Sequence, residues 1–143
     1  MSKHVLQDPE FRVRLTYAMR NLLPMLYGAD CVGFVDVVDD SDEAISRPSY
    51  VLAGRRKTDA IATAARQQAF ISLLRNHGFA YDKIEAYGGA DCCMAAVRRD
   101  DRTLAGAVVL VSSVMTPENC AAVQAAAAVI ESMLPDEQSG QTD

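Results

Sequence analysis

The sequence predicts a single small α/β domain, and three observations support this prediction. Amphipathic helix patterns lie near both ends of the chain and in its middle. Apolar, strand-like runs lie between them, so the expected order is helix, two strands, helix, three strands, helix. With 143 residues, half of them apolar, the chain can bury one contiguous core without disulfides or a structural metal.

The first helix is expected to begin at Asp8. The Asp8 carboxylate can cap the helix, and Pro9 loses no hydrogen bond in the first turn. Apolar residues then recur at spacings of three and four, at Phe11, Leu15, Met19, Leu22 and Leu26. Pro24 should kink the last turns, and Gly28 should end the helix.

The run CVGFVDVV, residues 31–38, predicts a strand that is buried on both faces and therefore central in its sheet. Asp36 interrupts this run, either as a buried acid with a raised pKa or as a strand-end carboxylate that hydrogen-bonds a loop. The polar segment 39–48 is expected to be a mobile loop, and a short second strand should cover residues 50–53.

The second helix is expected from Thr58 or Asp59 to about Asn76, with Gly78 as its terminator. Three further strands are predicted at residues 80–87, 91–98 and 104–111, and the last of these is again apolar on both faces. Thr116 and Pro117 should begin the final helix. The domain would then span residues 9–134, between a flexible N-terminus, 1–8, and a disordered tail, 135–143.

Composition and charge exclude several functions. A net charge of −5 argues against nucleic acid or an anionic membrane as the main partner. No apolar leader or membrane span is evident, so a cytoplasmic location is expected. The cysteines, Cys31, Cys92, Cys93 and Cys120, lack metal-binding or redox spacing, and adjacent Cys92 and Cys93 should point to opposite faces of a strand. We therefore expect no metal, no cofactor and, for want of a nucleophile with a base, no enzyme activity.

A basic turn is the best candidate for binding an anion. Arg55, Arg56 and Lys57 precede the N-terminus of the second helix, where backbone N–H groups and the helix dipole favour negative charge. No P-loop pattern is present, and Asp59 would compete for the same helix end. A plain solvated basic turn is therefore the favoured interpretation.

The third predicted strand is self-complementary. If two copies pair antiparallel about Ile84, Lys83 lies opposite Glu85 of the other copy, and Tyr81 lies opposite Tyr87. An ordinary solvated edge strand is the alternative. Cross-strand pairs contribute only about 0.2 to 1 kcal/mol each, so most of the association would have to come from apolar burial by the neighbouring helix. The residues expected at this homodimer interface are Ile61, Ala65, Tyr81, Lys83, Ile84, Glu85 and Tyr87.

The order of elements and the segments LLPMLYGADCVGFVDVVDD, AIATAARQQAFISLL and TLAGAVVLVSS resemble the roadblock family of regulatory domains. This resemblance implies a five-stranded antiparallel sheet in the order 2-1-5-4-3, with the first and third helices on one face and the long middle helix on the other. It also implies dimerisation through the third strand and middle helix, and binding to small GTPases. A GAF-like or PAS-like sensor domain is the second resemblance.

Two functions therefore remain open. The first is a non-enzymatic, homodimeric module that regulates or scaffolds a small GTPase or another signalling protein. The second is a sensor that encloses a small molecule between its sheet and a helix. A pocket of a few hundred Å³, lined by apolar residues with convergent polar groups, would favour the sensor. A flat, fully packed sheet that continues across two chains would favour the module.

Overall fold

The structure is a computed structural model that describes residues 5–36, 50–54, 68–84, 90–112 and 114–135. Its helices are the 3₁₀ turns η1 (Val5–Gln7) and η2 (Leu23–Met25) and the α-helices α1 (Pro9–Leu22), α3 (Gln68–His77) and α4 (Pro117–Ser132). Its strands are β1 (Ala29–Asp36), β2 (Tyr50–Gly54), β3 (Phe79–Ile84), β4 (Ala90–Arg98) and β5 (Leu104–Ser112). Within these residues no helix is long and apolar enough to cross a membrane.

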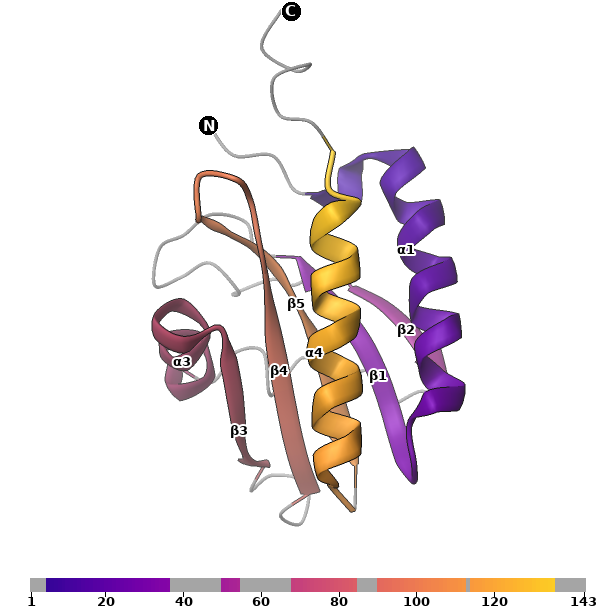
Figure 1. The fold of residues 1–143 in the computed structure, drawn as a ribbon, viewed down its shortest axis with the longest axis vertical. Helices are drawn as coiled ribbons and strands as arrows, with labels where there is room; N and C mark the ends of the chain where they lie inside the picture. The colour runs from indigo at the N-terminus through magenta and orange to yellow at the C-terminus, as the bar shows by residue number, and fades with distance from the viewer. Residues whose placement is uncertain (1–4, 37–49, 55–67, 85–89, 113, 136–143) are drawn as a thin grey trace, which may run out of the picture.

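The strands form one antiparallel sheet in the order β2-β1-β5-β4-β3 (Figure 1). Strand β5 lies in the centre and is buried along its whole length. The mixed α/β class and the antiparallel sheet expected from the sequence are confirmed. Strands β2 and β3 lie at the two edges of the sheet.

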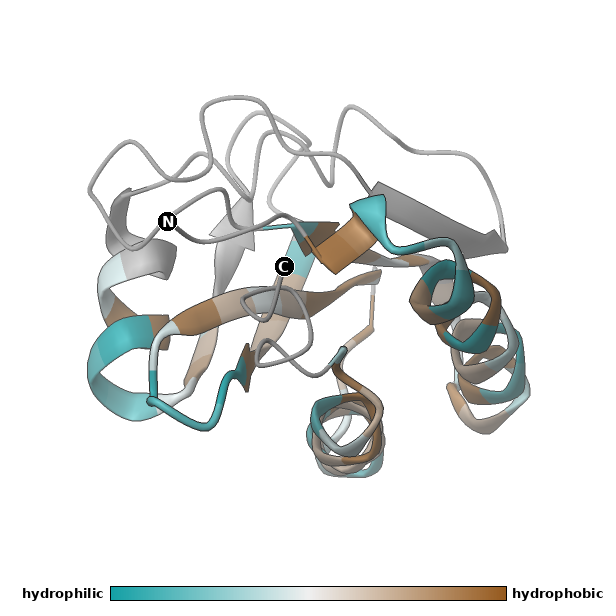
Figure 2. Ribbon diagram, turned by 90° about the horizontal axis from the view of Figure 1, so that it is seen from above, coloured by the Kyte–Doolittle hydropathy of each residue, from teal (hydrophilic) through white to brown (hydrophobic). Residues whose placement is uncertain are grey.

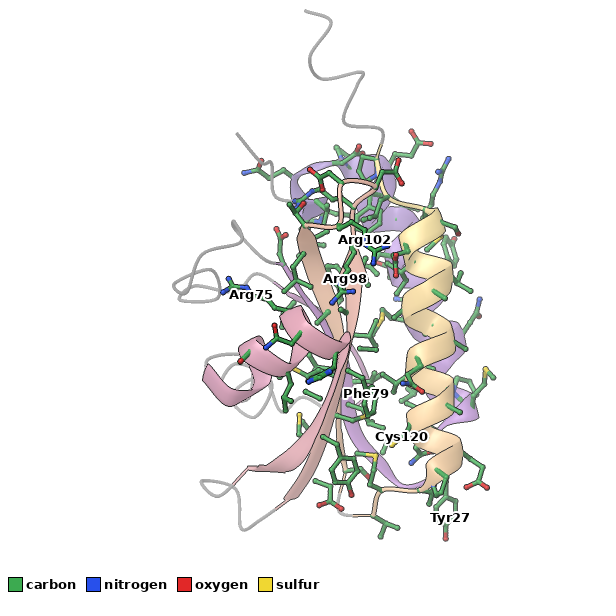
Figure 3. All side chains as sticks on the ribbon, turned by 60° about the vertical axis from the view of Figure 1, so that its left-hand side comes forward. Tyr27, Arg75, Phe79, Arg98, Arg102 and Cys120 are labelled. Carbon is green, nitrogen blue, oxygen red and sulfur yellow. The ribbon has the colours of Figure 1, made fainter. Side chains whose placement is uncertain are left out.

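Helices cover the sheet in two layers. Helices α1 and α4 lie side by side on one face (Figure 2), where they enclose the main apolar core. Helix α3 lies on the opposite side from α4 and contacts β3 and β4 (Figure 3). The helix expected at residues 58–76 is described only from Gln68 onward, and its earlier residues lie outside the described part of the chain.

The start of the chain is more ordered than the sequence suggested. Residues 1–8 were expected to be flexible, but Val5–Gln7 form η1 and the side chains of Val5 and Leu6 are buried in the core. Asp8 then caps α1 as expected, accepting hydrogen bonds from the backbone N–H groups of Glu10 at 2.9 Å and Phe11 at 3.2 Å. The isolated Val-Leu pair gives no periodic pattern, so periodicity alone could not place it in the core.

Buried polar side chains fix the start of α4 against the link between α1 and β1. The Asn119 amide accepts a hydrogen bond from Tyr27 N at 2.9 Å and donates one to Tyr27 O at 2.8 Å. Ser112 Oγ donates to Gly28 O at 2.8 Å. Because Asn119 is fully buried, these bonds compensate its desolvation and fix one end of the helical layer.

The centre of the sheet has no room at Gly106. A Cβ atom there would lie 2.4 Å from Phe34 Cζ and 2.5 Å from the Val35 carbonyl oxygen. The Phe34 ring is itself held by Phe11 of α1 in an edge-to-face contact, with ring centroids 6.1 Å apart. Neither the ring nor the backbone oxygen can move away freely.

We therefore expect Gly106→Ala to destabilise the fold by about 3 kcal/mol or more, because the added methyl group overpacks a rigid site. Gly28→Ala is the matched control. A Cβ at Gly28 meets nothing within 4 Å, and only its positive φ of 65° is unfavourable, so we expect a cost of about 1 kcal/mol. Urea unfolding followed by circular dichroism measures both values, and equal costs would contradict the packing described here.

Candidate functional site

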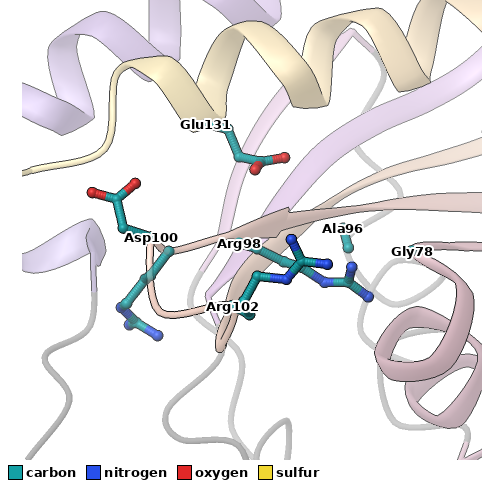
Figure 4. Close-up of a pocket in the computed structure, with 7 residues that line it drawn as sticks. Gly78, Ala96, Arg98, Asp100, Arg102 and Glu131 are labelled. Atoms are coloured by element: carbon teal, nitrogen blue, oxygen red, sulfur yellow. The ribbon is translucent and has the colours of Figure 1, made fainter.

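A hollow of about 410 Å³ opens beside the beginning of β3, where β4 continues past that strand into the β4–β5 turn (Figure 4). It is bounded by the end of α3, the β4–β5 hairpin and the last turns of α4. We call it the arginine hollow. Its lining residues are Gly78, Ala96, Arg98, Arg99, Asp100, Arg102 and Glu131.

Arg98 is held in place by the C-terminus of α3. One terminal nitrogen of its guanidinium donates to Leu74 O at 2.8 Å and to Arg75 O at 2.9 Å. These carbonyls belong to the last turn of the helix, where its dipole favours a cation. The guanidinium lies over Gly78, which terminates the helix with a φ of 76°. Helix and glycine together fix the charged group at the edge of the hollow.

Arg99 is folded back onto its own hairpin. It is buried, and it donates to Leu104 O at 3.1 Å and to Thr103 Oγ1 at 3.4 Å. Thr103 is in turn held by Asp101, whose carboxylate accepts from the threonine N–H at 3.0 Å and hydroxyl at 2.6 Å. These bonds lower the pKa of the exposed Asp101. Arg99 therefore contributes mainly to the shape of the turn.

Arg102 adopts a strained backbone conformation. Within the described residues it is the one non-glycine residue with a positive φ, 75°. The turn closes through Arg102 N to Arg99 O at 2.8 Å and Arg99 N to Thr103 O at 2.9 Å. Glycine or asparagine is usual at this left-handed position, and another residue costs roughly 1 to 2 kcal/mol there.

The exposed guanidinium of Arg102 reaches into the hollow beside that of Arg98 (Figure 4). Glu131 of α4 faces the pair from across the opening, and Asp100 lies on the turn. Within the described part of the chain Arg102 forms no ion pair. Three arginines and two carboxylates leave the lining with an excess of positive charge. Such a site suits a small ligand with an oxyanion group.

The described residues contain no cluster of three or more His, Cys, Asp or Glu side chains that could hold a metal ion. The arginine hollow also brings together no nucleophile with a base.

The sequence had placed its candidate sites elsewhere. Arg55, Arg56, Lys57, Ile61, Ala65, Glu85 and Tyr87 lie outside the described residues. Lys83 and Ile84 belong to β3, at the edge of the sheet, and the side chain of Tyr81 on the same strand is 46% exposed. The segment RRDDRT, residues 98–103, lies at the junction of two predicted strands and matches no binding motif. The one signal in the sequence that could have indicated a site here is Arg102, which occupies a turn position where glycine is usual.

A pair of thiols lies on the face of the sheet that α1 and α4 cover. Cys93 of β4 is buried, and the partly buried Cys120 of α4 lies beside it. Burial, followed by the neighbouring Cys120, raises the pKa of the Cys93 thiol far above its usual value. Cys92 is also buried, but it is not part of the main apolar core between the sheet and helices α1 and α4. Adjacent Cys92 and Cys93 are thus both buried and point to opposite faces of β4, as expected from the sequence.

Comparison with known proteins supports the fold. No protein-family profile matches the sequence, and neither does any curated protein. The C-terminal domain of the E. coli transcriptional regulator KdgR has a similar structure, with a TM-score of 0.55 and 14% identity over 86% of this chain and 98% of that one.

Two further structures are similar. A GAF domain from a protein described as a sensor histidine kinase of Pseudomonas syringae pv. tomato gives a TM-score of 0.51 and 14% identity, over 97% of this chain and 83% of that one. An IclR transcriptional regulator from Alicyclobacillus acidocaldarius gives a TM-score of 0.51 and 9% identity, over 87% of this chain and 68% of that one. The likeness supports the GAF-like resemblance at the level of the fold, and the roadblock resemblance is not shown.

The strained turn gives a stability prediction. Arg102→Gly should stabilise the protein by about 1 kcal/mol, because glycine adopts a positive φ without steric cost. Thermal unfolding of the full chain measures the effect. A melting temperature that falls would show that the arginine side chain contributes more to the fold than its backbone conformation costs.

The thiol pair gives a reactivity prediction. Because the thiolate is the reactive species, a raised pKa and burial should protect Cys93 from alkylation. Treating the folded protein with iodoacetamide at mildly alkaline pH should modify Cys120 well before Cys93, as measured by peptide mass spectrometry. Equal rates at Cys93 and Cys120 in the folded protein would contradict the environment described here.

Proposed function

We propose that this chain is a regulatory sensor domain that binds a small molecule and passes its presence to a signalling partner. The observation that carries this proposal is the fold shared with a GAF domain and with almost the whole C-terminal domain of the KdgR regulator. The arginine hollow supports it because about 410 Å³ suits a small-molecule site. Its polar lining differs from the apolar pocket expected for a sensor, which indicates a charged ligand.

The proposal includes three expectations from the sequence. The domain catalyses no reaction, it acts in the cytoplasm, and it needs no cofactor. A scaffolding module for a small GTPase is the second candidate. What favours that candidate is the position of β3 at the edge of the sheet with Tyr81 exposed on it.

Ligand-induced stabilisation tests the sensor proposal. A molecule that binds only the folded state raises the free energy of unfolding by RT ln(1 + [L]/Kd), about 2.7 kcal/mol at a hundredfold excess over Kd. We expect at least one compound in a broad metabolite panel to raise the melting temperature of the full chain. The free energy of unfolding should rise with the logarithm of the ligand concentration once that concentration exceeds Kd. A cosolute that is merely excluded from the protein surface also stabilises the fold, but it has no Kd and would not give this dependence. A panel that shifts nothing would contradict the sensor.

We also propose that the domain pairs with a second copy through β3. In that arrangement Lys83 of each copy faces Glu85 of the other, so the seam contains two such pairs. Each pair contributes about 0.2 to 1 kcal/mol. Lys83→Glu should therefore weaken the dimer, because like charges would meet across the seam. The double variant Lys83→Glu/Glu85→Lys should restore it. Sedimentation equilibrium measures the association, and a dimer that neither change affects would exclude this seam.

A further inference from the structure

We propose that the arginine hollow binds the oxyanion group of a small molecule, held by Arg98 and Arg102, while Glu131 accepts a hydrogen bond from a hydroxyl or ammonium group of the same molecule. This inference deepens the proposed function by naming the class of ligand. It rests on the lining residues, so it can fail while the sensor proposal stands.

Arg98 supplies a preorganised donor. Its two hydrogen bonds to the α3 carbonyls use one terminal nitrogen. A guanidinium has five N–H donors, so the Nε and second terminal N–H groups remain for a ligand. Because the helix already holds the side chain, little further ordering is needed when the ligand binds.

Arg102 supplies the second donor at a cost to the fold. Its left-handed backbone conformation is unfavourable for any residue with a Cβ atom. Nothing in the described hydrogen bonds of the turn requires the side chain, because Arg102 closes the turn through its backbone N–H. A function for the guanidinium in the hollow explains why an arginine at this position is useful. Two arginines that line one hollow also repel each other, and an oxyanion between them would relieve this repulsion.

Glu131 and Asp100 narrow the class of ligand. Both carboxylates line the same hollow, so a simple anion such as inorganic phosphate would be partly repelled. A molecule with an oxyanion at one end and a hydrogen-bond donor at the other satisfies both kinds of side chain. The volume of about 410 Å³ limits it to the size of a small metabolite.

Isothermal titration calorimetry of the full chain at low ionic strength tests this inference. Glycerol 3-phosphate and β-alanine provide a phosphate and a carboxylate, each with a donor group, and glycerol and sodium chloride are the controls. We expect saturable binding of at least one of the two anionic probes and none of the controls. Binding by neither probe would overturn the inference.

Variants of the hollow separate specific binding from general charge. Arg102→Gly should weaken binding by about tenfold or more, the loss expected for one charge-assisted hydrogen bond. Arg102→Asn should weaken binding to a similar extent, since asparagine also lacks the guanidinium and tolerates the left-handed conformation. Arg20→Ala is the matched control, because Arg20 is exposed on α1 and does not line the hollow. Equal losses in Arg102→Gly and Arg20→Ala would overturn the site.

Glu131→Gln tests the role of the carboxylate. Inorganic sulfate carries no proton near neutral pH and so has no donor group that needs Glu131; it should therefore bind this variant more tightly than the parent. Weaker or unchanged sulfate binding would contradict the assigned role. A panel compound that stabilises the parent and Arg102→Gly equally would reject the hollow as the site and leave the sensor proposal standing.

Discussion

The fold depends on the pairing of β5 along both of its edges. It bonds to β1 on one side and β4 on the other, and every residue from Leu104 to Ser112 is buried. A strand in this position cannot expose a polar side chain on either face, which explains why every residue from Leu104 to Val111 is apolar. The close approach of Phe34 and the Val35 carbonyl oxygen to Gly106 further limits which residue can occupy that point.

The candidate site follows from how the chain leaves β4 and enters β5. The hairpin between them carries Arg98, Arg99 and Arg102 within five residues, and α3 and α4 end close to it on either side. The negative end of α3 fixes Arg98, while the turn fixes Arg102 in a strained conformation. A rigid sheet thus presents two guanidinium groups beside a carboxylate of another element. Such preorganisation is what a selective small-molecule site requires.

Much of the architecture could be predicted from the sequence because it depends on local signals. The Asp8 and Thr116 caps and the buried runs of β1 and β5 all have short-range causes, and the structure places them as expected. The first helix was expected to bend at Pro24 and end at Gly28, but α1 ends at Leu22 and Leu23–Met25 form the 3₁₀ turn η2, because proline offers no N–H to continue the α-helix. The burial of Val5 and Leu6 could not be predicted, because it depends on the distant surface that they cover. The hydrogen bonds between Asn119 and Tyr27 were missed for the same reason, since the two residues lie 92 positions apart. The residues of the arginine hollow come from one hairpin and from the ends of two helices. No spacing in the sequence shows that these three segments lie close together in space.

The most direct test of a small-molecule site in this fold is an NMR titration that follows the arginine side-chain Nε–H signals of the full chain as an anionic ligand is added. The account predicts that the signals of Arg98 and Arg102 and the backbone amide of Gly78 move together and saturate at one concentration, while Arg20 stays unchanged. Shifts that spread evenly over all arginines, or that leave Arg98 and Arg102 unaffected, would contradict it.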